Sequence, residues 1–167
     1  MDKVRFEKLF DELEQPLLRY AFFLVKEEEF AKDIVQDSFI KLLKQEQQPE
    51  NAKAWMYTVC RNLIIDNARR AKKIIFHENY AELSPGYEEK DEIMEDENVK
   101  EIRRVIDRLP LVEKEVVILK FYEMKSYKEI SLLTGKSVTN VGFILHQAIK
   151  RLKSLLKKDE SLTTGIE

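Results

Sequence analysis

The 167-residue chain is poor in glycine and proline, with only 4 of each. Together they are less than half as frequent as in an average protein, where glycine is roughly 7% and proline roughly 5% of residues. Tight turns must therefore be scarce, which excludes a strand-rich sandwich or barrel. The composition predicts an all-α fold, and the length allows two small helical domains.

Cysteine, histidine and long apolar runs are also lacking. Cys60 is the single cysteine, so an internal disulfide is impossible, and His77 and His146 lack the spacing of a zinc site. The longest apolar run, Tyr20 to Val25, has 6 residues, whereas roughly 20 are needed to span a bilayer. We therefore expect a cytoplasmic protein with no membrane insertion, no metal and no cofactor.

Charge of one sign does not dominate the chain, whose net charge is -2. The charges are nevertheless unevenly distributed: residues 1–75 carry a net +1, residues 76–100 a net -7 and residues 101–158 a net +7. An acidic middle between a mixed half and a basic half indicates a connector and a C-terminal half that attracts anions.

Apolar residues recur at helical spacing through the first half. One stripe runs from Phe6 to Leu24, a second helix is expected over residues 28–44, and a third over residues 51–73. A polar loop over residues 45–51 separates the second helix from the third. These helices form the predicted N-terminal domain, residues 1–75.

The periodicity disappears over residues 76–97, which we interpret as a flexible acidic linker. It returns in the predicted C-terminal domain, residues 98–158, with a helix that ends before Pro110 and another over residues 112–122. Residues 159–167 form a tail.

The end of that domain has the order of a helix-turn-helix. Ser126 and Glu129 have the spacing of a capping box, which predicts a short helix that ends at Thr134. Gly135 then supplies the residue with positive φ, and Ser137 caps a longer last helix. A short helix, a glycine-containing turn and a longer helix are typical of DNA-binding helix-turn-helix units.

No residue set suggests catalysis. Asp33 and Asp37 lie one helical turn apart on a charged helix, which is typical of a solvated face, and Cys60 has no histidine partner in its sequence context. The four glycines are scattered singly, so no phosphate-binding loop is present. We expect no enzymatic activity.

A basic cluster marks the end of the third helix: Arg61, Arg69, Arg70, Lys72 and Lys73. Cations at a helix C-terminus complement its dipole, but one or two suffice for that purpose. The excess favours contact with nucleic-acid phosphates.

Four sequence stretches together resemble one protein family. They are residues 31–39 (AKDIVQDSF), Ala54-Trp55 followed by residues 60–66 (CRNLIID) and Arg69-Arg70, Leu109-Pro110, and residues 126–130 (SYKEI). In this order, and with a helix-turn-helix at the end, they resemble an extracytoplasmic-function (ECF) sigma factor of bacterial RNA polymerase.

The resemblance implies two DNA-binding domains and specific partners: core RNA polymerase, promoter DNA and, as a further candidate, an anti-sigma factor. Asp33 and Gln36 would dock on the polymerase clamp helices, with Val35 and Phe39 packed behind them. The loop of residues 45–51 and Asn62 would hold a base flipped out of the -10 element. Arg61, Arg69, Arg70, Lys72 and Lys73 would contact the adjacent DNA backbone.

For the -35 element, the resemblance points to the last helix and its flanks: Lys136, Asn140, Gly142, Phe143, His146, Gln147, Lys150 and Arg151. Family members usually carry cations or small polar residues where this chain has Gly142, Phe143, Ile144 and Gln147. We expect Phe143 to be exposed and to contact thymine methyl groups, Gly142 to permit close backbone approach, and Gln147 to pair with adenine. The alternative is that Phe143 belongs to a protein interface.

The sequence leaves two questions open. The acidic linker either imitates nucleic acid in the polymerase channel or is only an extended tether. The chain as a whole is predicted to be an alternative sigma factor. The alternatives are a helix-turn-helix regulator that acts without polymerase and a sigma-like module that binds chiefly another protein.

Overall fold

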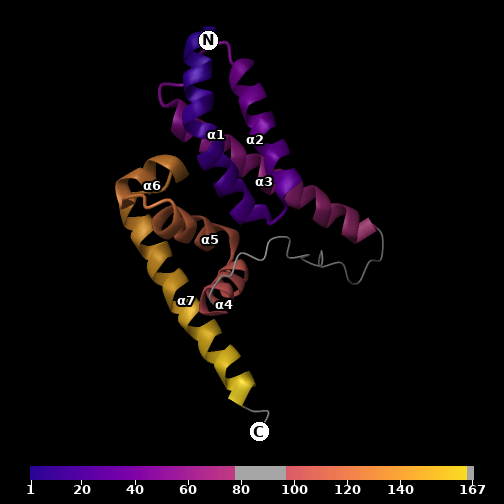
Figure 1. Cartoon of the computed structure of the whole chain (residues 1–167), viewed down its shortest axis with the longest axis vertical. Coiled ribbons are helices and arrows are strands. Elements are labelled where there is room, and N and C mark those ends of the chain that lie inside the picture. The colour runs from indigo at the N-terminus through magenta and orange to yellow at the C-terminus, as the bar shows by residue number, and fades with distance from the viewer. Residues whose placement is uncertain (78–96, 165–167) are drawn as a thin grey trace.

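The computed structural model describes residues 1–77 and 97–164; within these ranges, the side chains of residues 72–77, 99 and 161–164 are not described. Every regular element in these ranges is helical, which confirms the all-α prediction. Figure 1 shows helices α1, α2 and α3 in one group and α4 to α7 in a second group beside it. None of the helices in the described ranges is both long and apolar enough to cross a membrane.

The N-terminal group begins with α1 (Lys3–Val25), which is capped by Asp2 through a 2.9 Å bond from the backbone N–H of Arg5. The apolar stripe predicted from the sequence is buried, with Leu17, Tyr20 and Ala21 fully inaccessible. Lys26 ends α1 in the left-handed conformation, with φ of 62°. The chain then turns directly into α2 (Glu28–Leu43).

Helix α3 (Ala52–His77) is longer than predicted and continues into the first residues of the expected linker. The Asn51 side chain accepts a bond from the N–H of Ala54 and so stabilises the start of the helix. Cys60 is fully buried 3.1 Å from the Ser38 hydroxyl; burial raises its pKa to about 11, and the Ser38 contact partly opposes this shift. Cys60 is therefore a packing residue.

The C-terminal group consists of α4 (Glu97–Asp107), α5 (Leu111–Val117), the π-helical turn η1 (Ile118–Tyr122), α6 (Tyr127–Thr134) and α7 (Val138–Thr164). The helix expected over residues 112–122 thus widens from α to π after Val117. The rest of the acidic linker, residues 78–96, lies outside the described residues. The two interpretations of the linker are therefore not tested by the structure.

The predicted helix-turn-helix is confirmed in its details. Ser126 and Glu129 form both bonds of a capping box at the start of α6. Gly135 has φ of 70° at the end of that helix, and the Ser137 hydroxyl accepts a 3.1 Å bond from the N–H of Asn140 at the start of α7. These contacts fix the turn between α6 and α7.

The two helical groups are in contact, which the sequence did not predict. Helix α3 packs on α6, and α1 packs on α5 and η1, so that one buried apolar cluster runs from Leu13 to Ala148 through both groups. Phe23 of α1 and Tyr122 of η1 add an aromatic contact with ring centroids 4.5 Å apart.

Candidate nucleic-acid interface

The exposed face of α2 carries both residues expected to dock on polymerase. Asp33 and Gln36 are exposed, while Ile34, Val35 and Phe39 are buried on the opposite face. Neither Asp33 nor Gln36 contacts another side chain of the described residues through a hydrogen bond or ion pair. The structure therefore leaves this polar face available to a partner.

A small pocket of about 190 Å³ lies between the end of α2 and the middle of α3. It brings together Gln45 and Asn62, which the family resemblance placed around a flipped base. The remaining lining residues are Lys41, Trp55, Val59, Leu63 and Asp66. Of the polar loop of residues 45–51, only Gln45 reaches the pocket.

Trp55 and Asp66 are pocket residues that the sequence reasoning missed. Their spacing contained a usable signal, because Trp55, Asn62 and Asp66 are seven and four residues apart and so fall on one face of a helix. The pocket thus combines an aromatic ring, an amide and a carboxylate.

The cations predicted for the -10 element do not form one cluster. Arg69 and Arg70 are exposed on the C-terminal half of α3, where they are accessible to phosphates. Lys72 and Lys73 belong to the same helix, but their side chains lie outside the described part of the chain.

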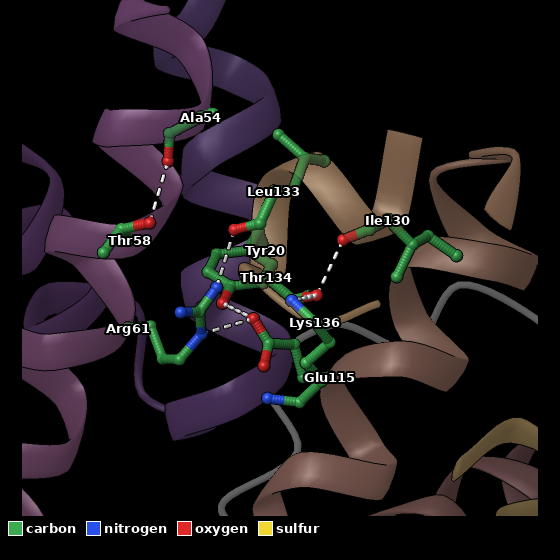
Figure 2. Close-up of polar contacts among 9 residues, drawn as sticks. All are labelled: Tyr20, Ala54, Thr58, Arg61, Glu115, Ile130, Leu133, Thr134 and Lys136. Atoms are coloured by element: carbon green, nitrogen blue, oxygen red, sulfur yellow. Dashed lines mark hydrogen bonds and ion pairs between the residues drawn. The ribbon is translucent and has the colours of Figure 1, made fainter. Parts of the chain in front are cut away.

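Arg61 faces in a different direction, toward the C-terminal group (Figure 2). Its Nε donates to Glu115 Oε1 at 2.7 Å and one terminal nitrogen donates to the carbonyl of Leu133 at 2.7 Å. The side chains of Arg61 and Glu115 are 13% and 2% exposed. In this arrangement Arg61 is withdrawn from solvent and does not contribute to the basic surface of Arg69 and Arg70.

Glu115 also accepts a 2.7 Å bond from the Tyr20 hydroxyl, so α1, α3 and α5 meet at one carboxylate. Burial raises the pKa of Tyr20 well above its usual value, and the negative charge of Glu115 raises it further. Burial alone would lower the pKa of Arg61, but the Glu115 charge, the neighbouring Tyr20 and the hydrogen bonds to both groups together raise it. Tyr20 therefore stays a neutral donor and Arg61 a cation.

The helix-turn-helix presents most of its predicted contact residues to solvent. Asn140, His146, Gln147 and Lys150 are exposed, and Lys136 is half-buried. Phe143 is 61% exposed, which confirms that it faces solvent in the free protein. Arg151 forms two bonds to Glu113, at 2.9 and 3.3 Å.

Gly142 has a neighbour that the sequence did not predict. A Cβ atom at this position would lie 3.5 Å from the Tyr127 ring of α6, at ordinary contact distance. The side chain that approaches Gly142 is therefore Tyr127. Lys120 in turn lies 5.2 Å from the centre of the Tyr127 ring, in cation–π geometry.

Comparison with known proteins places these features in one family. Residues 9–74 match the family described as Sigma-70 region 2, and residues 100–152 match the family described as Sigma-70, region 4. The chain is 33% identical over 151 residues to the RNA polymerase sigma factor SigV of Bacillus subtilis, with 87% of each chain covered. It is 28% identical over 159 residues to the sigma factor YlaC of the same organism, covering 91% of this chain and 92% of YlaC.

Two solved structures show the same fold. One is the sigma factor RpoE in complex with the anti-sigma factor NepR from Bartonella quintana, with a TM-score of 0.74, 20% identity and coverage of 92% of this chain and 97% of RpoE. The other is CnrH in complex with the cytosolic domain of CnrY, with a TM-score of 0.63, 21% identity and coverage of 95% and 91%. The chain belongs to the extracytoplasmic-function RNA polymerase sigma factors, which bind core polymerase and direct promoter recognition and transcription initiation.

Proposed function

We propose that residues 1–75 dock on polymerase and bind the opened -10 element, and that residues 98–158 bind the -35 element as duplex. The observation that carries this assignment is the pocket between α2 and α3, which joins Gln45 and Asn62 to Trp55 and Asp66. In this proposal the chain has no catalytic activity of its own, because its chemistry is recognition, and it acts in the cytoplasm with core polymerase.

The pocket has the groups needed to hold one unstacked base. Any of the four bases can stack on an aromatic ring, and this stacking contributes about 1 to 3 kcal/mol per base. The side-chain amides of Asn62 and Gln45 read the donor and acceptor pattern of a base edge. Gln45 donates its amide N–H to the carbonyl of Lys41 at 3.4 Å, which directs its amide oxygen to accept.

The neighbouring cations have a separate task in this proposal. Arg69 and Arg70 follow the pocket along α3 and are exposed, so they can neutralise phosphates on either side of the flipped base. We assign Lys72 and Lys73 to the same backbone contact because they continue the helix.

For the -35 element we propose that the exposed residues of α7 enter the major groove. Phe143 would contact thymine methyl groups and Gln147 adenine, with Asn140 and His146 beside them. Lys136, Lys150 and Arg151 would contact phosphates before and after the base-reading turns. Gly142, beside the Tyr127 ring of α6, would permit close approach of the backbone to DNA.

An anti-sigma factor is a further proposed partner, since the similar sigma factor RpoE described above is in complex with the anti-sigma factor NepR. A mostly apolar groove of about 690 Å³, which reaches from Leu24 and Phe30 to Ile65, Ala68 and Leu111, supports docking of an apolar segment of that protein. If so, Ala68→Glu should raise reporter expression in cells while run-off transcription with purified components stays unchanged. Unchanged expression in cells would contradict this groove as the docking site.

The experiment that tests the main proposal is transcription with purified core polymerase on fragmented genomic DNA, followed by mapping of start sites. We expect transcripts from a defined set of promoters only when the chain is added. Asn62→Ala should then change the preference at one base of the -10 element, whereas Gln48→Ala, outside the pocket, should not. Binding to the same sites without core polymerase would favour a polymerase-independent regulator, and absence of transcripts would favour a protein-interaction module.

A further inference from the structure

We propose that Glu115 is an internal counter-ion for Arg61 that holds the free chain closed, and that Arg61 exchanges this carboxylate for a DNA phosphate when the domains separate. This proposal rests on the assignment of the two domains to the -10 and -35 elements. It adds a control step within the chain itself, since the same guanidinium cannot serve Glu115 and DNA at once.

Hydrogen bonds from largely buried side chains hold the two helical groups together at the junction. Glu115 Oε1 receives both Arg61 Nε and the Tyr20 hydroxyl at 2.7 Å, and the second bond of Arg61 goes to the Leu133 carbonyl in α6. The Arg61 side chain of α3 is thus bonded to two helices of the C-terminal group, α5 and α6. Figure 2 shows Arg61 extending toward Glu115 and Leu133.

In the closed chain, the surfaces proposed to read the -10 and -35 elements lie closer together than the two elements do on DNA. The two elements lie about 25 base pairs apart, as their names state, which is about 85 Å of straight duplex at 3.4 Å per base pair. Arg61 is bonded to Leu133, and Phe143 follows only ten residues later. Ten residues span at most about 36 Å when fully extended, so the two reading surfaces cannot reach both elements until the contact opens.

The remaining junction contacts favour a reversible closure. Lys26 pairs with Asp107 at 2.6 Å and Arg19 with Glu123 at 3.3 Å, so two further ion pairs bridge the domains. Buried ion pairs contribute little net stability, because desolvation offsets their attraction. The Tyr57 hydroxyl is also buried without a hydrogen-bond partner, and it would gain one on exposure to water.

Arg61 forms the same type of hydrogen bond before and after the exchange. Its guanidinium forms charge-assisted bonds to a carboxylate in the closed chain, and phosphate oxygens accept the same kind of bond. Polymerase and promoter therefore supply a replacement partner, and Glu115 becomes hydrated when the domains part. Glu115→Gln preserves the shape of the side chain but removes the counter-charge.

The test is energy transfer between dyes on Glu12→Cys and Lys157→Cys, two exposed positions in different helical groups. The native Cys60 is fully buried and does not compete for the label. We expect Glu115→Gln to lower the transfer efficiency of the free chain toward the value measured with core polymerase. Asp107→Asn, at a partly exposed junction site, should lower it as well and covers the case in which Glu115→Gln fails to fold.

Glu113→Gln is the matched control, because Glu113 pairs with Arg151 inside the C-terminal group and should leave the efficiency unchanged. In run-off transcription, the concentration of chain that half-saturates core polymerase should fall about tenfold for Glu115→Gln, since a larger fraction is competent to assemble. Unchanged energy transfer, or an opened chain with unchanged half-saturation, overturns the proposal. If the wild type directs no transcription, the proposed function and the phosphate exchange both fail, while the energy-transfer result still decides whether Glu115 closes the chain.

Discussion

Arg61 and Glu115 are 54 residues apart in sequence and form a buried ion pair of 2.7 Å. Arg61 follows Cys60 on the helix that also bears Asn62, and Glu115 lies on the helix that supports the helix-turn-helix. A residue expected to contact DNA is therefore engaged within the protein. While Arg61 is bonded to Glu115, its guanidinium is not available to a phosphate of promoter DNA.

The two tyrosines at this junction should respond differently to loss of their hydroxyls. Their rings are in contact, with centroids 4.9 Å apart, but only Tyr20 has a hydrogen-bond partner. A hydrogen bond to a charged group contributes about 1.5 to 3 kcal/mol, so we expect Tyr20→Phe to lower the free energy of unfolding by that amount. Tyr57→Phe should be neutral or stabilising. Urea denaturation measures both, and equal losses would contradict the partner assignment.

Local features of the fold could be predicted from the sequence because they depend on neighbouring residues. The capping box of Ser126 and Glu129, the positive φ of Gly135 and the exposure of Phe143 are all confirmed. Each follows from spacing along one helix or one turn.

Long-range contacts could not be predicted in this way. Glu115 occurs in an amphipathic helical segment, where a charged residue is expected on the solvated face. The spacing of apolar residues does not indicate that Glu115 bonds to Tyr20, 95 residues away. The pocket was found in part: the family resemblance related Asn62 to the loop that begins at Gln45, but the roles of Trp55 and Asp66 needed the packing of α2 against α3.

The exposed face of α2 gives a prediction for polymerase docking. Asp33→Lys with Gln36→Ala should weaken binding to core polymerase by at least tenfold, because it reverses one charge and removes one amide where no packing is disturbed. Circular dichroism should stay unchanged, since both residues are exposed. Asp11→Lys, an exposed site on α1, provides the control for the charge reversal. Unchanged core affinity in the folded double variant would contradict the docking assignment.

The arginines beyond the pocket should act through phosphates. Arg69→Ala with Arg70→Ala removes two exposed cations, so the slope of log affinity against log salt for holoenzyme on promoter DNA should decrease by about 0.7 to 0.9 for each lost contact. Base preference should not change. Lys3→Ala with Lys8→Ala removes the same charge from α1, and an equal effect there would show that only net charge matters.

The capping box of α6 gives a pH dependence. The backbone N–H of Ser126 and, next, its side chain lower the pKa of Glu129 in the folded protein. Its contribution to stability is therefore present above the unfolded pKa, about 4.3, and is lost as the pH falls through the lower folded value. We expect Glu129→Gln to be less stable than the wild type at pH 7, and this difference to shrink as the pH falls below the unfolded pKa of about 4.3. A stability difference that stays constant as the pH falls would argue against the ionised cap.

The last prediction concerns Phe143, which is 61% exposed on the helix proposed to enter the major groove. An apolar side chain in that groove distinguishes thymine by its methyl group. Replacing thymine by uracil in a mapped -35 element should therefore weaken binding of the holoenzyme, and Phe143→Ser should weaken it to a similar extent. Combining both changes should add little, because they remove the same contact. Val138→Ser, also on the exposed surface of α7, should respond to uracil as the wild type does. If Phe143→Ser and the wild type lose equal affinity with uracil, the methyl contact is rejected and Phe143 belongs to a protein interface instead.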